Sequence, residues 1–276
     1  MRSIAIPKGY QFAGVYAGIK RNPDKLDLTL IVSDRATTAA GVYTQNLVFA
    51  APVKLNRART PCEAIRAVVI NSGNANACTG ERGDRDAARM AELAANACGA
   101  KAEQALVLST GVIGEFLPME KIISGISAAA ARLAADDDAL LSAASGMLTT
   151  DTRHKLAGRT MQIDGREVRT VGMAKGAAMI GPRMATMLGV VLTDATLTSQ
   201  AAQDALSAAV ETTFNCISVD GHMSTNDTVL LLANGAAGGP PLVDGALGQF
   251  RTALEEVCGE LARAIASDGE GATHLV

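Results

Sequence analysis

Residues 175–188 read Lys-Gly-Ala-Ala-Met-Ile-Gly-Pro-Arg-Met-Ala-Thr-Met-Leu, and the junction Ala185–Thr186 lies near their end. A threonine after a small residue, in a stretch rich in Gly and Pro, suits self-cleavage: its hydroxyl attacks the preceding carbonyl and leaves Thr186 as a new N-terminus. Such a threonine carries its own base, because a free α-amine with a reference pKa of about 7.7–8.0 is partly unprotonated near neutral pH. An isolated Ala-Thr pair is usually ordinary backbone, so this interpretation depends on the rest of the sequence.

Strand-like and helix-like segments surround this stretch and favour a layered α/β or α+β fold over a doubly wound sheet, since they alternate irregularly. Asp164-Gly165 is typical of a tight hairpin turn between two strands, and Pro118 is placed to begin a helix. Apolar runs predict strands within 12–19, 26–32, 41–44, 67–70, 105–108, 168–173, 190–192 and 229–232. Helical periodicity predicts helices at 84–98 (with Asp84 as N-cap), 119–135, 200–213 and 246–266.

Composition narrows the class of protein. Of 276 residues, 48% are hydrophobic but only 3% aromatic, so Ala, Val, Leu and Ile must build the core. The net charge of −3, with scattered Lys and Arg, argues against a nucleic-acid partner, and no apolar run reaches the ~18 residues of a membrane span. Five cysteines without a C-x-x-C pair and three isolated histidines predict a cytoplasmic protein with reduced thiols and no metal site.

Further motifs flank the central stretch on both sides. They lie at Asn71–Gly80, Ser109–Gly114, Thr149–Thr152, Val219–Gly221, Ser224–Asp227 and Asp268–Thr273. Together with Lys175-Gly176, Met179, Pro182 and Met184–Leu188, these spaced motifs resemble the glutamate N-acetyltransferase (ornithine acetyltransferase) family, in the same order. The resemblance implies a sandwich-like, self-processing α/β fold. Processing would divide the chain into an α part, 1–185, and a β part, 186–276, which stay associated as α2β2.

Acyl transfer through a hydroxyl needs a nucleophile, a base and donors for the oxyanion. Thr186 supplies the first two. Thr110-Gly111 follows a predicted strand, and Gly111 allows close approach of backbone to a reacting carbonyl. The residues alone favour an ordinary strand-end turn here. The resemblance instead implies an oxyanion hole made of the Thr110 hydroxyl and the Gly111 N–H.

The remaining site residues also come from the resemblance. It implies that Lys175 and Thr149 meet the substrate carboxylate, that Thr186 contacts substrate as well, and that Glu270 suits a cationic ornithine amine. Taken alone, a single Lys is usually a solvated charge, and a Glu in Asp-Gly-Glu-Gly is usually a turn residue. Asn71–Asn74 reads as turn and helix-cap chemistry, with no catalytic role, and Ser224–Asp227 is expected to organise the site by hydrogen bonding.

The activity implied by the resemblance is acetyl transfer from N2-acetylornithine to glutamate through acetyl-Thr186, in arginine biosynthesis, without metal or bound cofactor. Some family members also accept acetyl-CoA, and nothing in the residues decides that point. His222 stands where the family usually has an acidic residue, which exchanges a negative charge for a group titrating near neutral pH.

Two other functions stay open. The same N-terminal threonine could transfer the acyl group to water, as an amidohydrolase or aminopeptidase does. The chain also stops where the family continues with a region that carries an Asn and a Thr of the substrate site. A fragment, or a truncated protein with little or no transferase activity that serves as a binding or subunit-like module, is therefore the second alternative.

Overall fold

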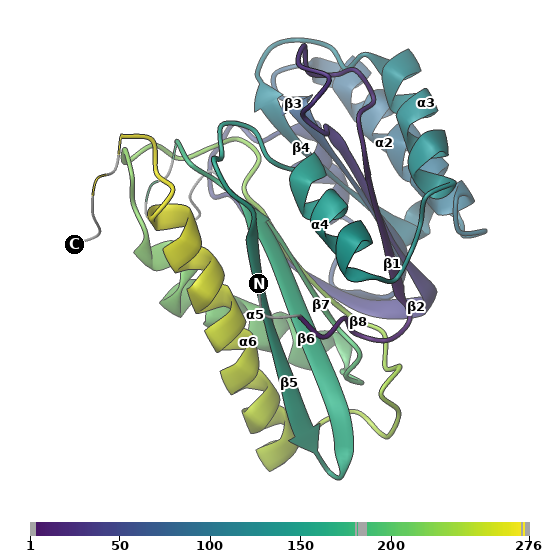
Figure 1. The fold of residues 1–276 in the computed structure, drawn as a ribbon, viewed down its shortest axis with the longest axis vertical. Coiled ribbons are helices and arrows are strands. Elements are labelled where there is room, and N and C mark those ends of the chain that lie inside the picture. The colour runs from purple at the N-terminus through teal and green to yellow at the C-terminus, as the bar shows by residue number, and fades with distance from the viewer. Residues whose placement is uncertain (1–3, 180, 182–186, 272, 274–276) are drawn as a thin grey trace.

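The long strand β2 (Leu28–Tyr43) joins two halves of one eight-stranded sheet (Figure 1). The computed structural model describes residues 4–179, 181, 187–271 and 273. The other strands are β1 (Tyr10–Val15), β3 (Cys62–Asn74), β4 (Ala105–Val112), β5 (Lys155–Ile163), β6 (Arg166–Lys175), β7 (Leu188–Thr193) and β8 (Thr228–Ala233). The helices are α1 (Ala51–Arg57), α2 (Gly80–Asn96), α3 (Met119–Ala130), α4 (Asp137–Gly146), α5 (Ser199–Thr212) and α6 (Asp244–Ala266), with 3-10 turns η1 (Ala102–Gln104) and η2 (Phe214–Cys216).

The strand order is β4-β3-β2-β8-β7-β6-β5, and β1 pairs with the first part of β2. A register shift between Val32 and Thr37 divides β2. Before the shift β2 pairs with β1 and β3. After it, Thr37 and Ala39 still pair with β3, and residues 38–43 pair with β8. The pairs β3/β4 and β7/β8 are parallel, and each is connected through a helical segment. Because a bulge bends and twists a strand, the two halves of the sheet face each other instead of forming one open surface.

Three apolar clusters define the layers. One cluster packs α2 and α3 against β1–β4, and another packs α5 and α6 against β5–β8. The third lies between the two sheet halves and includes α4, with Phe12 and Ile70 from one half and Val171 and Leu230 from the other. The layers are therefore helix, sheet, sheet and helix. This confirms the predicted layered α/β sandwich, whose core is built mainly from Ala, Val, Leu and Ile.

The division between α part and β part stays a prediction, but the topology bears on it. Strands β7 and β8 belong to the proposed β part, 186–276, and they lie in the sheet between β2 and β6 of the α part. Each part therefore shares strand pairs and core with the other. A cut between residues 185 and 186 would leave the two pieces joined by the hydrogen bonds that β7 and β8 make to β6 and β2.

Most expected strands and the Asp164-Gly165 hairpin are confirmed; both turn residues have positive φ. The single helix expected at 119–135 is wrong: α3 ends at Ala130 and a separate α4 follows. Ala134 exchanges two backbone hydrogen bonds with Phe12, which draws the chain off the helical path. Asp136 then begins α4 by accepting the N–H of Ala139 at 2.8 Å.

The expected start of α2 is also wrong. The helix begins at Gly80, one turn before Asp84, and Asp84 pairs with Lys54 of α1 at 2.5 Å instead of capping.

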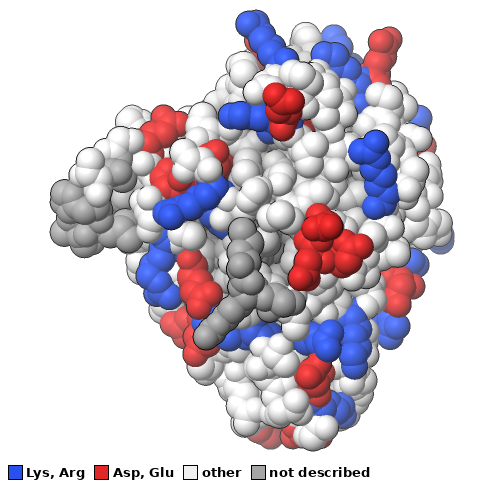
Figure 2. Space-filling view, in the orientation of Figure 1, with Lys and Arg blue, Asp and Glu red and all other residues white. Residues whose placement is uncertain are grey.

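Asn71–Asn74 is not a turn but the end of β3, because Ser72 and Gly73 pair in parallel register with Thr110 and Gly111. The charged side chains are mixed in sign on the face in Figure 2, as the even spread of Lys and Arg along the sequence predicts.

Candidate active site

Side chains from β4 and β6 meet at one end of the sandwich. Lys175, the last residue of β6, donates from Nζ to Oγ1 of Thr110 near the end of β4, at 3.3 Å. Both side chains are buried, with 3% and 5% exposed. Strands β7 and β8 begin at the same end of the sandwich, because β7 is antiparallel to β6 and parallel to β8. Met187 directly precedes β7, and Asp227 directly precedes β8, so both lie at this end. The fold therefore brings together residues that are far apart in the chain.

Gly111 is required where it stands. Its φ is +133°, and a Cβ there would lie 2.3 Å from the carbonyl carbon of Gly73 and 2.5 Å from the amide nitrogen of Asn74. Any other residue would collide with backbone that cannot move without breaking the β3/β4 pairing. Gly111 itself is exposed. The end of β4 thus offers an accessible glycine backbone directly after a buried hydroxyl.

Buried amides fix the strand ends around Thr110. Oδ1 of Asn71 accepts the Ser109 hydroxyl at 2.6 Å. Nδ2 of Asn226 donates to the carbonyls of Ser109 (2.8 Å) and Ala75 (2.7 Å), which ties the start of β8 to the ends of β3 and β4. The expected hydrogen-bonding role of Ser224–Asp227 is borne out for Asn226. The sequence did not indicate the role of Asn71, because the partner of its side chain lies on another strand.

The ammonium of Lys175 lies in a low-dielectric site. Burial lowers its pKa below the ordinary lysine value, while the carboxylate of Asp151 opposes this and favours the charged form. Burial by itself would raise the pKa of Asp151, but the charges of Lys175 and Lys155 and its hydrogen bonds hold it below the usual range. Asp151 is thus the ionised counter-charge of Lys175, a role that the sequence analysis did not assign.

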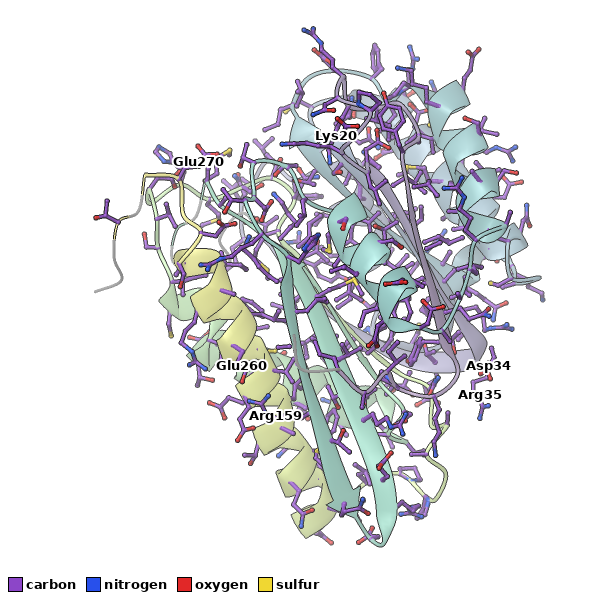
Figure 3. The ribbon with its side chains drawn as sticks, viewed as in Figure 1. Lys20, Asp34, Arg35, Arg159, Glu260 and Glu270 are labelled. Carbon is purple, nitrogen blue, oxygen red and sulfur yellow. The ribbon has the colours of Figure 1, made fainter. Side chains whose placement is uncertain are left out.

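Thr149 and Glu270 lie around the same lysine. Thr149 is half-buried, and its amide donates to Oδ2 of Asp151 at 3.0 Å. Glu270 is exposed, beyond the end of α6 (Figure 3), and its amide donates to the carbonyl of Ala177 at 2.7 Å. Its carboxylate is near enough to favour the charged form of Lys175. The structure therefore gathers Thr110, Lys175, Thr149 and Glu270 in one region.

Asp227 is a buried carboxyl beside the proposed junction. Its Oδ1 accepts the amide of Met187 at 3.1 Å, and its Oδ2 has no hydrogen-bond partner within the part of the chain that the structure describes. Burial raises the pKa of Asp227 well above its usual range, although the hydrogen bond from Met187, the polar groups of Ser224 and the charge of Lys175 oppose this. Ala185 and Thr186, the predicted cleavage pair, lie outside the described residues.

A cavity of about 360 Å³ adjoins Thr149 and Asp151. Lys20 lines it and donates from Nζ to the carbonyls of Leu26 and Leu148, each at 2.6 Å. Burial lowers the pKa of Lys20 to about 8.

The described residues contain no group of three or more Cys, His, Asp or Glu side chains that could hold a metal ion. Among them there is also no helix long and apolar enough to cross a membrane.

The predicted departure at His222 lies on the surface. His222 is exposed, its amide donates to Oδ1 of Asp220 at 3.1 Å, and its Nδ1 is 3.5 Å from the same oxygen. The other oxygen of Asp220 accepts the amide of Met179 at 2.7 Å. The carboxylate of Asp220 therefore connects this loop to Met179 of the Gly/Pro-rich stretch.

Curated proteins and solved structures are similar to this chain. The Arginine biosynthesis bifunctional protein ArgJ of Symbiobacterium thermophilum is 51% identical over 99% of this chain and 68% of its own length. A solved ArgJ from Bacillus halodurans is 37% identical, with a TM-score of 0.61, covering 66% of this chain and 92% of that one. Ornithine acetyltransferase from Mycobacterium tuberculosis, solved with ornithine, is 32% identical, with a TM-score of 0.57, covering 66% and 96%.

A more distant solved structure shares the fold alone. It is an L-aminopeptidase D-Ala-esterase/amidase from Ochrobactrum anthropi described as a variant of the Ntn-hydrolase fold, 10% identical over 98% of this chain and 88% of its own, with a TM-score of 0.52. This similarity agrees with the helix–sheet–sheet–helix layering. The model of the ArgJ family matches residues 11–276, so this chain belongs to the ArgJ family.

Proposed function

We propose that this protein transfers the acetyl group of N2-acetylornithine to glutamate and so acts in arginine biosynthesis. Membership of the ArgJ family supports an acyltransferase, since a solved relative is an ornithine acetyltransferase that binds ornithine. The observation that carries the proposal is the buried contact between Lys175 and Thr110. It lies directly before Gly111, at the end of the sandwich where Leu188 begins β7. This contact places a cation that can bind a carboxylate beside a hydroxyl that can donate to an oxyanion.

The catalyst forms by self-cleavage. The hydroxyl of Thr186 attacks the carbonyl of Ala185, the peptide C–N bond breaks, and water then hydrolyses the resulting ester to free the α part. Alignments to the two solved relatives nearly span those chains yet cover 66% of this one, or about 182 residues, close to the 185 before the junction. That coverage supports a family whose members are held as two chains. The shared sheet supports their association, and the proposed assembly is α2β2.

The transfer follows a ping-pong course. Oγ of Thr186 attacks the acetyl carbonyl, and its proton passes to the α-amine of the same residue. The amide C–N bond breaks, that proton moves to the departing nitrogen of ornithine, and acetyl-Thr186 remains. The amine of glutamate then attacks the ester carbonyl, gives a proton to the α-amine, and leaves as N-acetylglutamate while the proton returns to Oγ.

Thr110 and Gly111 stabilise the oxyanion. An ammonium can only donate hydrogen bonds, so in the contact with Lys175 the oxygen of Thr110 accepts. The hydroxyl proton of Thr110 is then free to point toward a developing negative charge. A positive donor on a hydroxyl oxygen also makes that hydroxyl a stronger donor. With the backbone N–H of Gly111 this forms a two-donor oxyanion hole.

Lys175 and Thr149 also bind the substrate carboxylate, and Glu270 binds the side-chain ammonium of ornithine. The buried ammonium of Lys175 is a strong partner for a carboxylate because water competes poorly there. Glu270 is exposed, and its carboxylate is near enough to favour the charged form of Lys175, which suits the far end of an extended amino acid. No metal or bound cofactor is needed, so EDTA treatment and dialysis should leave the rate unchanged.

The first alternative is hydrolysis by the same threonine. A solved aminopeptidase with the same fold is the reason to test this alternative. A transferase releases N-acetylglutamate from N2-acetylornithine when glutamate is present and forms little product without it. A hydrolase releases acetate at the same rate with or without glutamate. Acetyl-CoA in place of N2-acetylornithine tests the second donor in the same assay.

The testing experiment is an intact mass of the denatured protein, with N-terminal sequencing of the smaller species, on wild type, Thr186→Ala and Thr186→Ser. We expect two chains from wild type, one beginning at Thr186, a single chain from Thr186→Ala, and slower cleavage of Thr186→Ser. Two chains from Thr186→Ala would disprove the junction. A wild type that stays uncut and transfers nothing would instead favour the inactive or binding-module alternative.

A further inference from the structure

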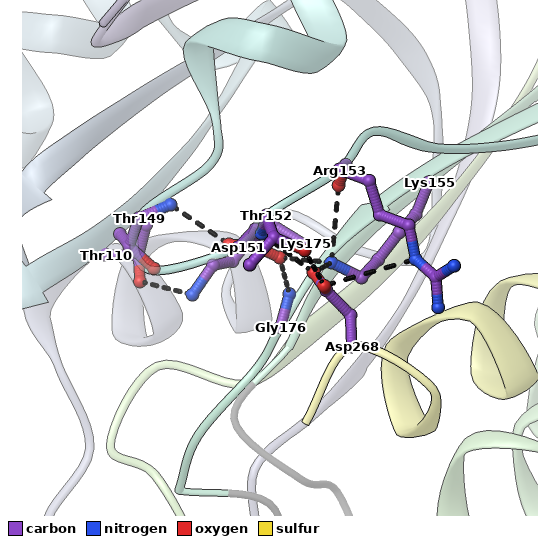
Figure 4. Close-up of polar contacts among 9 residues, drawn as sticks. All are labelled: Thr110, Thr149, Asp151, Thr152, Arg153, Lys155, Lys175, Gly176 and Asp268. Carbon is purple, nitrogen blue, oxygen red and sulfur yellow. Dashed lines mark hydrogen bonds and ion pairs between the residues drawn. The ribbon is translucent and has the colours of Figure 1, made fainter. Parts of the chain in front are cut away.

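Three separate segments carry the residues that the proposed site needs. Thr149 lies in the loop after α4, Lys175 ends β6, and Glu270 follows α6. A buried lysine, Lys155 at the start of β5, lies between these segments (Figure 4). Its side chain has no exposed surface, and it belongs to none of the motifs that led to the site.

Lys155 bridges two carboxylates. Its Nζ lies 2.6 Å from Oδ1 of Asp151 and 2.6 Å from Oδ2 of Asp268. Both distances are those of strong, charge-assisted hydrogen bonds. The hydrogen bonds to Lys155 and Thr152 keep the pKa of Asp268 below its usual range, although burial would raise it. The two carboxylates therefore stay ionised at neutral pH, and their contacts with Nζ of Lys155 make the three side chains one connected buried unit.

Asp151 connects this unit to two of the three segments. The amide of Gly176, which follows Lys175, donates to its Oδ1 at 2.7 Å, and the amide of Thr149 donates to its Oδ2 at 3.0 Å. The Asp151 carboxylate thus holds the backbone at Gly176 and at Thr149, which belong to two of the three segments. Its orientation depends on Lys155, which holds the same Oδ1.

Asp268 connects the unit to the third segment. Its Oδ2 accepts the amide of Thr152 at 3.0 Å and its Oδ1 accepts the Thr152 hydroxyl. Two residues later, the amide of Glu270 donates to the carbonyl of Ala177. The segment after α6 is therefore tied to the loop after α4 and to the end of β6 through one aspartate and one backbone bond.

Stability alone is a weak reason for such a unit, because removing three charges from water costs about as much as their pairing returns. Fixed geometry is a better reason. We propose that Lys155 is a positioning residue of the active site, which acts through Asp151 and Asp268 to hold Thr149, Lys175 and Glu270 in the arrangement that binds substrate. The substrate named here rests on the proposed function, while the coupling of the three segments does not.

The test uses two variants and a matched control. Asp268→Asn keeps an oxygen acceptor for Thr152 but removes the charge that faces Lys155. Lys155→Met combined with Asp268→Asn removes one buried charge of each sign, so that Lys175 and Asp151 remain balanced. The control is Glu260→Gln on α6, which makes the same charge change at an exposed pair with Arg159 (Figure 3). Each protein is compared with wild type by hydrogen–deuterium exchange, steady-state kinetics and thermal melting.

In both variants we expect faster exchange at 268–271 and 176–177, with helix α6 unchanged. We expect the KM for N2-acetylornithine to rise about tenfold or more, the KM for glutamate to rise less, and kcat to stay within about threefold. The control should match wild type in all of these. A variant that melts earlier while its exchange at 268–271 and both KM values match the control would overturn the proposal, since that is what a purely structural ion pair produces.

Failure of the proposed function would look different. In that case wild type itself transfers no acetyl group, and ornithine binding measured by calorimetry replaces KM. Faster exchange together with weaker ornithine binding in the variants would still support positioning by Lys155. Unchanged exchange and unchanged binding would reject it, whatever the chain turns over.

Discussion

The ammonium of Lys175 donates to the hydroxyl of Thr110 across 3.3 Å, and the two residues lie 65 positions apart in the chain. One ends β6 and the other nears the end of β4, strands that belong to opposite halves of the sheet. Because an ammonium can only donate hydrogen bonds, the oxygen of Thr110 is the acceptor in this contact. In the proposed reaction, substrate binding and oxyanion stabilisation therefore share one buried pair.

Thr110→Val should reduce kcat for acetyl transfer by about 10²- to 10³-fold, the usual cost of losing one oxyanion donor. The KM for N2-acetylornithine should change little, because the hydroxyl acts on charge that appears only in the transition state. Single-turnover formation of acetyl-Thr186, followed by mass spectrometry, measures this step. Thr110→Ser is the control and should keep most of the rate. Equal rates for the Val and Ser variants would remove Thr110 from the oxyanion hole.

Substrate binding should weaken as pH rises. The pKa of Lys175 is lowered by burial, so its ammonium, which holds the carboxylate, is lost at a lower pH than for an ordinary lysine. The α-amine of Thr186 must be unprotonated to act as base, so this group makes catalysis faster as pH rises. We expect a bell-shaped profile of kcat/KM, with an alkaline limb that disappears in Lys175→Met. The same alkaline limb in that variant would assign it to another group.

Glu270→Gln should raise the KM for N2-acetylornithine by about 5- to 30-fold, which corresponds to about 1–2 kcal/mol for one charged hydrogen bond at a partly exposed site. The glutamate half-reaction should be nearly unchanged, because glutamate has no side-chain ammonium. Kinetics with each substrate varied separately tests this. Equal effects on both substrates, or none on either, would argue against contact between Glu270 and the ornithine amine. Glu260→Gln is again the matched control.

Asp227→Asn should stabilise the protein at neutral pH by about 1–3 kcal/mol, the usual size of an uncompensated desolvation cost, because the amide has no charge for burial to disfavour. The pKa of Asp227 is raised well above its unfolded value near 3.9. Its ionisation therefore costs stability increasingly as pH rises from about 4 toward the folded pKa, and that cost is absent below pH 4.

The difference in melting temperature between Asp227→Asn and wild type should therefore grow between pH 4 and pH 7. An Asn side chain still offers an oxygen to the amide of Met187, so that contact should survive. A variant that melts lower than wild type at pH 7 would show that the carboxylate is satisfied by groups outside the described residues. Intact-mass time courses on the same samples report whether the carboxyl also affects cleavage.

Local patterns determined much of the fold. The Asp164-Gly165 turn and the amphipathic helices α5 and α6 follow from turn chemistry and periodicity, which act over neighbouring residues. The spaced motifs, read as a resemblance, named the family and Thr110, Lys175, Thr149 and Glu270. The break between α3 and α4 could not be read in this way, because it depends on Ala134 pairing with a strand more than a hundred residues earlier.

The tertiary structure alone decided which partners the buried residues contact. Gly73 and Gly111 are both unremarkable as single glycines, and only the parallel pairing of β3 with β4 brings their backbones too close for a Cβ. Lys155 and Asp268 lie 113 positions apart, and no spacing rule predicts their contact. Sequence periodicity reports which face of an element is apolar, whereas the partners and pKa shifts of buried polar groups depend on which distant elements pack around them.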